Sequence, residues 1–326
     1  MPARKKESKD ANKPKAVFAK SPGLRRGESR DDLLSRFLAE CARHAYGNEA
    51  CILETDHIEG VHQMRVGLRR LRACLSLFEP LVQEEGVGIA HDWISPLLDA
   101  LGPARDWDVF IRDRFDRFKP ERSDPHSLEL LRKAAEAKRS SAYATLRNLM
   151  KTSEAYRAKH ALINWIARRG WREDTPKGKL KSLESPAVVF ARDSLHETRR
   201  RALKKGRNLS ELPPRKLHKL RIAIKKHRYP VDFFANSFEG RQGKKYTAAL
   251  KTLQTELGRV NDVSVAGALI DELSLSTELQ PAVDLLMERA QADHDASMTR
   301  LHDHWRDFKG LTTFWKNRIR SAKDQE

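Results

Sequence analysis

The chain has 326 residues, of which 39% are hydrophobic and 33% charged, so it can bury a core and is not disordered throughout. It carries 63 Lys and Arg against 45 Asp and Glu, a formal net charge of +18, which predicts an anionic partner such as nucleic acid, acidic lipid or polyphosphate. The three cysteines form no CxxC pair, and no apolar stretch reaches about 18 residues. We therefore expect a cytoplasmic protein without a zinc ribbon, a signal peptide or a membrane-spanning helix.

Helical patterns dominate most of the chain. The N-terminal segment is rich in Lys, Arg and Pro and poor in large apolar groups, which predicts a disordered basic tail. Apolar residues at helical spacing follow, with Asp31 or Asp32 placed to cap the first helix. Because alternating strand patterns are nearly absent, we expect an all-α fold. The predicted organisation is a basic tail (1–30), a first helical half (31–174), a connecting Pro, Gly, Lys and Ser segment that interrupts the helical pattern (175–186) and a second helical half (187–326).

An internal repeat relates the two halves at an offset of 156 residues. The stretch HQMRVGLRRLRACLSLF, which begins at His62, aligns with HKLRIAIKKHRYPVDFF, which begins at His218. The same offset, without a gap, aligns LLDALGPARDWDV from Leu97 with LQTELGRVNDVSV from Leu253. Register kept over this distance indicates an internal duplication.

Each copy of the first stretch carries basic residues on one helical face. A helix turns about 100 degrees per residue, so positions three, seven and ten after the histidine fall close to it on the helix surface. An adjoining apolar face would pack into the bundle, and His227 takes the apolar place of Leu71 there. The first stripe is His62, Arg65, Arg69 and Arg72; the second stripe is His218, Arg221, Lys225 and Arg228.

Such a stripe can serve a ligand or be an ordinary solvated surface. Four like charges on one face repel each other, and an acidic ligand would remove that cost. The alternative is a face neutralised by the chain's own Asp and Glu, which would be the better explanation for a single run. Two runs in matching register favour a ligand, and a linear one with repeated charges suits the length of the stripe.

Other chemistry is less well supported by the sequence. A His at the head of a basic stripe can contact phosphate, act in catalysis or pack, and we expect ligand contact because no spacing suggests a catalytic triad. Asp106 and Asp108 follow a Gly-Pro pair, where capping a helix or pairing with a base is commoner than binding Mg²⁺. The spacing of His294, His302 and His304 fits a solvated helix face better than a metal site. We expect no catalytic residue, no metal and no cofactor.

The motif HxxRxxxRRxR from His62, its second version from His218 and the LGxxRDxDV element at 101–109 resemble the CHAD family, the conserved histidine α-helical domain. The resemblance extends over roughly residues 31–315. It implies two pseudo-symmetric helical bundles whose basic helices converge on a central groove or pore that binds inorganic polyphosphate. It also implies association with polyphosphate granules in the cytoplasm. Some members are fused to a triphosphate hydrolase with an ExExK signature, which is missing here, so we expect a stand-alone binding module that is not an enzyme.

Carried onto this chain, the resemblance points to the eight residues of the two stripes as polyphosphate ligands. The second LGxxRDxDV element is degraded, with Asn261 in place of Arg105 and Ser264 in place of Asp108. Because Lys225 lacks the bidentate fork of Arg, the first half is expected to grip phosphate more specifically. Further candidates for polyphosphate contact are Arg70 and Lys226, which match the motif but lie off the stripes, and Arg36, Arg43, Arg192, His196 and Arg199, for which ordinary surface charge is the alternative.

Nucleic-acid binding is the second hypothesis, since charge and the basic tail would serve it equally well. Against it, the basic motif carries no interleaved aromatic residues for base stacking and matches no known reader motif. Hydrolysis of polyphosphate is a third hypothesis that rests only on His and Asp near the expected phosphates.

Overall fold

The computed structural model describes residues 13–82, 84–116, 125–173, 175–273 and 277–320. Within these ranges the chain is helical, and extended segments meet only in two isolated bridges, Ser29 with Pro186 and Phe238 with Ile319. The all-α prediction is confirmed. The α-helices are α1 (Arg30–Tyr46), α2 (Glu49–Glu54), α3 (Ile58–Phe78), α4 (Glu84–Ile111), α5 (Pro125–Met150), α6 (Ser153–Ala167), α7 (Lys177–Leu183), α8 (Ala187–Lys205), α9 (Pro214–Phe234), α10 (Gln242–Asp271) and α11 (Gln280–Gly310).

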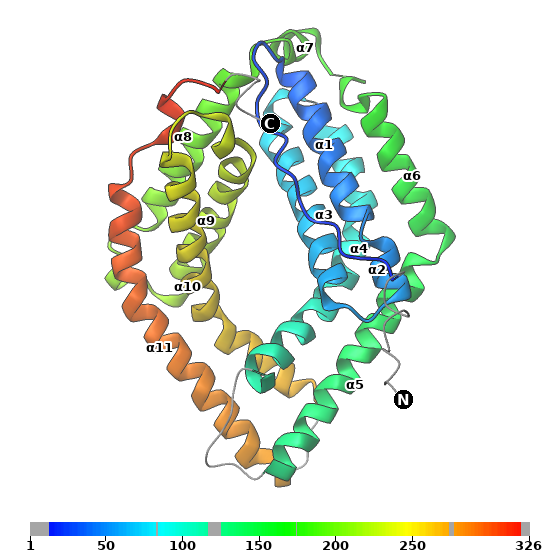
Figure 1. The fold of residues 1–326 in the computed structure, drawn as a ribbon, viewed down its shortest axis with the longest axis vertical. Coiled ribbons are helices and arrows are strands. Elements are labelled where there is room, and N and C mark those ends of the chain that lie inside the picture. The colour runs from blue at the N-terminus through cyan, green and yellow to red at the C-terminus, as the bar shows by residue number, and fades with distance from the viewer. Residues whose placement is uncertain (1–12, 83, 117–124, 174, 274–276, 321–326) are drawn as a thin grey trace, which may run out of the picture.

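The order of helices in the first half returns in the second. Each bound of α9 is the corresponding bound of α3 shifted by 156 residues, from Ile58 to Pro214 and from Phe78 to Phe234. α1 packs on α3, α3 on α4 and α4 on α5, and α8, α9, α10 and α11 pack in the same sequence. The two sets of helices lie beside each other and approach again where α5 and α11 converge (Figure 1).

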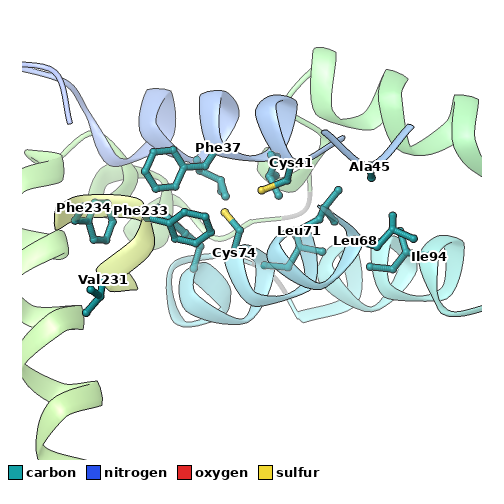
Figure 2. Packing of buried hydrophobic residues seen from close by; sticks show 14 of the residues in the cluster. Phe37, Cys41, Ala45, Leu68, Leu71, Cys74, Ile94, Val231, Phe233 and Phe234 are labelled. Carbon is teal, nitrogen blue, oxygen red and sulfur yellow. The ribbon is translucent and has the colours of Figure 1, made fainter. Parts of the chain in front are cut away.

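The apolar face expected on the repeated helix forms the core. In α3 the side chains of Val61, Met64, Leu68 and Leu71 are fully buried, and Leu71 lies against α1 together with Cys74 (Figure 2). The equivalent face of α9 is buried as well, and it includes His227, which has no exposed surface. The helical period of apolar residues therefore identified the buried face of both helices.

Two apolar contacts join the halves at opposite ends. At one end Phe37 of α1 stacks on Phe233 and Phe234 of α9, with ring centroids 4.8 and 5.5 Å apart. At the other end a second cluster gathers Trp107 and Phe110 of α4 with residues of α5, α10 and α11. The stripes lie on helices held between these two contacts.

The N-terminal prediction is wrong for residues 13–30, while residues 1–12 lie outside the described part. Leu24 is buried, and its backbone N–H donates to Ser237 Oγ at 2.7 Å. Asn48 exchanges hydrogen bonds of 2.9 Å with both backbone groups of Val17. Side chains from distant helices thus satisfy the backbone of a segment whose own composition offers little to pack.

Two local predictions also need correction. The first helix is capped by Ser29, whose Oγ accepts from the Asp32 N–H at 3.1 Å, and not by Asp31 or Asp32. Asp31 is buried and accepts from Trp171 Nε1 at 2.7 Å. The segment 175–186, predicted to connect the halves and to interrupt the helical pattern, contains the short helix α7. No helix in the described ranges is long and apolar enough to cross a membrane.

Candidate polyanion-binding site

The first stripe lies along α3, and most of its donors have no partner in the described part of the chain. His62, Arg65 and Arg69 are partly buried and Arg72 is exposed. Arg65 NH1 makes one long contact, 3.4 Å, with the carbonyl oxygen of Leu98. Within the described residues, His62, Arg69 and Arg72 make no hydrogen bond and no ion pair. Guanidinium groups held in this state can offer bidentate contacts to an oxyanion.

Two further arginines lie near His62: Arg105 in α4 and Arg112 at the start of the short π-helix that follows α4. Burial lowers the pKa of His62 below its ordinary value, and the cations of Arg105 and Arg112 act in the same direction. Burial and the neighbouring Arg112 also lower the pKa of Arg105. Arg112 donates to Asp113 through Nε and NH2 at 2.8 and 2.9 Å, so part of this charge is already compensated. An anion placed beside His62 and Arg105 would still be stabilised.

An aspartate faces the first arginine of each stripe. Asp106 interacts electrostatically with Arg65, and Asp262, 156 residues later, interacts with Arg221. Partial desolvation raises the pKa of Asp106 and of Asp262 above the ordinary value, although the arginines favour the charged form and Asp106 keeps an exposed side chain. The second copy of LGxxRDxDV therefore keeps the Asp that meets the stripe even though it lost its Arg.

The second stripe is more exposed and partly committed to the protein. His218 is exposed, whereas Arg221 and Lys225 are partly buried and make no hydrogen bond or ion pair within the described ranges. Arg228 Nε donates to Asp232 Oδ2 at 3.0 Å, and its NH1 donates to Gln254 Oε1 at 2.7 Å. The last basic residue of the second stripe is thus engaged, while its counterpart Arg72 is not.

The two stripes belong to helices that contact each other. α3 packs against α9, and Tyr229 of α9 influences the pKa of Arg65. Asp106 also senses Glu272 at the end of α10, and Asp262 senses Arg114 from the first half. Charged groups of the two halves are thus close enough to shift each other's pKa values.

A sequence profile of the CHAD domain matches residues 36–271, which contain both stripes and most of the repeat. The chain belongs to the CHAD family. No protein in the curated collections matches the sequence significantly.

Solved structures agree with this CHAD assignment. The CHAD domain from the plant Ricinus communis superposes with a TM-score of 0.77 at 25% identity, over 94% of this chain and 99% of that one. PptA from Streptomyces chartreusis superposes with a TM-score of 0.60 at 15% identity, over 86% of this chain and all of that one, and shows the same fold.

The further candidates of this CHAD chain do not join the stripes. Arg70 is 6% exposed, lies 5.4 Å from the ring centroid of Phe233 and donates to the carbonyl of Lys20. Arg36 is bound to Glu28 and to the carbonyls of Pro22 and Gly23. Their donors hold the N-terminal segment and the junction between the halves.

The remaining candidates are dispersed. Arg43 pairs with Glu40, Arg192 donates to the carbonyls of Trp315 and Asn317, and Arg199 donates to that of Lys309. His196 is exposed, and Lys226 lines a cavity between α8 and α9. Within the described residues, none of these side chains contacts a stripe residue, so we leave them out of the site.

Sequence reasoning missed that Arg105 and Arg112 lie near the first stripe, where both affect the pKa of His62. Arg105 belongs to the LGxxRDxDV element, and its place one residue before Asp106 was the signal available.

The helix-capping prediction for Asp106 and Asp108 is wrong, because α4 continues through Pro103 and both residues lie inside it. Pairing with a base is correct: Asp108 accepts from Arg139 Nε at 3.0 Å and from Tyr143 OH at 2.9 Å.

Proposed function

We propose that this CHAD protein binds inorganic polyphosphate without hydrolysing it, through the first and second stripes together. One observation carries the proposal: six of the eight stripe residues make no hydrogen bond or ion pair within the described part of the chain. The six are His62, Arg69, Arg72, His218, Arg221 and Lys225.

A linear polyphosphate suits this arrangement because its charges repeat along its length. The first and last arginines of the first stripe are separated by seven positions in α3, which is about 10 Å along a helix. Successive phosphates can meet successive arginines over that distance. Arg105 and Arg112 add charge beside the first stripe, so we assign them to the same site. By this account the protein resides in the cytoplasm at polyphosphate granules.

The experiment is a titration of the full chain with long-chain polyphosphate at physiological ionic strength, with duplex DNA and sulfate as competitors. We expect polyphosphate to bind more tightly than either competitor at equal charge concentration. Displacement of polyphosphate by DNA at equal phosphate concentration would instead support nucleic-acid binding, and equal binding of all three would show charge without specificity.

A matched pair of variants locates the binding. Replacing Arg65, Arg69, Arg221 and Arg228 by Ala removes four stripe charges, and should weaken binding by a factor of roughly a hundred or more, since a lost hydrogen bond to a charged group costs about 1.5 kcal/mol or more. The control replaces four exposed arginines elsewhere by Ala, and it should change affinity only a few-fold. The control residues are Arg132, Arg157, Arg168 and Arg306.

Absence of turnover is tested separately, by incubating the protein with polyphosphate and Mg²⁺ and measuring released phosphate. We expect no release above buffer. Sustained release that His62→Ala abolishes would replace binding by catalysis as the function.

A further inference from the structure

Two adjoining cavities lie between α8 and α9 in the second half. The larger has a volume of about 480 Å³ and the smaller about 320 Å³, and both are lined by Lys204, Lys205 and Lys219. Because they share these residues, they form one elongated depression, which we call the α8–α9 groove. Its other lining residues are Glu197, Thr198, Arg200, Arg201, Ile222, Ala223 and Lys226 in the larger cavity, and Arg207, Leu212 and Lys216 in the smaller.

The larger cavity occupies the place of a closed seam in the first half. Shifted back by 156 residues, Arg201 and Ala223 become Ala45 and Gly67. There α1 and α3 touch so closely that a Cβ on Gly67 would lie 2.7 Å from the Ala45 Cα. The seam is closed to solvent, with Ala45 of α1 and Leu68 and Leu71 of α3 fully buried (Figure 2).

Residue replacements at these equivalent positions keep the second seam open. In the first half, His44 of α1 and Gln63 of α3 form a hydrogen bond next to Gly67, with Nε2 and Oε1 2.9 Å apart. Both side chains are buried. Their equivalents Arg200 and Lys219 are exposed. Long cationic side chains on facing helices repel and extend into solvent, so they cannot fill the space that small residues close in the first half.

Charge in the groove is strongly one-sided. Six cationic side chains line the larger cavity, and Glu197 is its one acidic residue among those described. Glu197 is already paired with Arg200 and Arg201, at 2.7 and 2.6 Å. None of the lysines in the groove has an acidic partner within ion-pair distance in the described ranges. This concentration of cations in about 480 Å³ calls for a compact ligand with dense negative charge.

The groove lies on a different side of α9 from the second stripe. Taking His218 as zero and about 100 degrees per residue, Lys219, Ile222 and Lys226 centre near 75 degrees, while the stripe centres near 320 degrees. The buried apolar residues of α9 lie on a third side of the helix, away from both the groove and the stripe. A ligand in the groove and a ligand on the stripe therefore use different side chains.

We propose that the α8–α9 groove is a second anion-binding site, separate from the stripes, that takes an oligophosphate chain. Phosphate is favoured over carboxylate because each phosphate unit supplies charge and several acceptor oxygens in a small volume. The elongated shape suits a chain in place of a single phosphate, and Ile222, 41% exposed, gives the groove an apolar floor. With two separate sites, one molecule can hold two polyanion strands.

Isothermal titration of the full chain with inorganic tripolyphosphate at physiological ionic strength tests this proposal. The wild type should bind two equivalents, whereas a groove variant with Lys204, Lys205 and Lys219 replaced by Ala should bind one. The stripe variant, with Arg65, Arg69, Arg221 and Arg228 replaced by Ala, should also bind one. A control with exposed Lys133, Lys151 and Lys177 replaced by Ala should keep two.

The outcomes separate this inference from the proposed function. A groove variant that still binds the wild-type number of equivalents overturns the second site. If the stripe variant binds like the wild type but the groove variant loses an equivalent, the function proposed for the stripes fails and the groove site stands. A polyglutamate peptide of equal charge that displaces tripolyphosphate from the stripe variant at equal concentration overturns phosphate as the ligand class. All substituted lysines are exposed, and Lys219→Glu provides a second, single-site variant should the triple variant fold poorly.

Discussion

The seam between α1 and α3 and the seam between α8 and α9 occupy equivalent positions and are built in opposite ways. In the first, Gly67 lets the helix backbones touch near Ala45, and the neighbouring positions are small or buried. In the second, the residues at those positions are Ala223 and Arg201, and basic side chains surround a cavity. The same order of helices thus supports a closed seam and an open, charged one.

The stripes differ between the halves in the same sense. The first stripe is crowded by Arg105 and Arg112, and its Arg69 and Arg72 are uncommitted within the described ranges. The second stripe has Lys225 in place of an arginine, and Arg228 is held by Asp232 and Gln254. We infer that the first half concentrates phosphate recognition on the stripe, while the second divides its charge between stripe and groove.

The largest expected effect compares the two stripes directly. Arg65→Ala with Arg69→Ala should weaken polyphosphate binding about a hundredfold, at about 1.4 kcal/mol for each tenfold step. Lys225→Ala with Arg228→Ala should weaken it about tenfold, because Lys225 has no fork and Arg228 is already engaged. Both variants remove two positive charges, so equal losses in a titration would show that net charge alone governs binding.

The next largest effect concerns His227, the buried counterpart of Leu71. Burial lowers the pKa of His227 to about 3, whereas an unfolded His titrates near 6.5. Between these values the unfolded chain binds the extra proton, so stability falls as pH falls, by about 2 kcal/mol at pH 5 relative to neutral pH.

Chemical denaturation at several pH values measures this effect. His227→Leu should flatten the pH dependence below 6.5, and it should also lower stability at pH 7, because Thr198 and Tyr246 lose their hydrogen-bond partner. An unchanged pH profile in the variant would assign the dependence to other groups.

An effect of similar size tests the two seams. Gly67→Ala should destabilise the protein by about 2 kcal/mol, because the new Cβ would meet the Ala45 backbone at 2.6 to 2.7 Å. Ala223→Gly, at the equivalent position of the open seam, should cost about 1 kcal/mol, which is the helix propensity difference alone. Thermal denaturation of both variants compares them, and a Gly67→Ala protein as stable as the wild type would contradict the close approach of α1 and α3.

The smallest effect belongs to the aspartates that face the stripes. Asp106→Asn should tighten polyphosphate binding a few-fold at pH 7, since it removes a negative charge near Arg65. The raised pKa of Asp106 and the lowered pKa of His62 predict that wild-type affinity increases as pH falls from 7 to about 5, because a bound polyanion favours the protonated form of both groups. Titrations at two pH values measure this, and affinity that falls with pH would be contradictory.

Helical period and repeat register sufficed to predict the all-α fold and the buried face of α3 and α9. They could do so because these features depend on residues close together in one helix. The packing of residues 13–30 could not be predicted, since its hydrogen bonds come from Asn48 and Ser237, far along the chain. The burial of Asp31 could not be predicted for the same reason, because its hydrogen-bond donor Trp171 lies far along the chain.

The members of the candidate site show the same division. The stripes follow from spacing within one helix, but the contribution of Arg105 depends on how α4 lies against α3. Arg70 is excluded from the site because it lies against Phe233 of the second half, a contact that spacing within one helix cannot predict. The open seam left a trace in the repeat itself, where Ala45 aligns with Arg201.

Arginine footprinting tests the location of the binding site most directly. The protein is modified with phenylglyoxal with and without long-chain polyphosphate, and each arginine is quantified by mass spectrometry. We expect polyphosphate to protect Arg69, Arg72 and Arg221, and to leave the exposed Arg157 and Arg306 as reactive as before. Equal protection of all exposed arginines, or no protection on the stripes, would contradict binding by the two stripes.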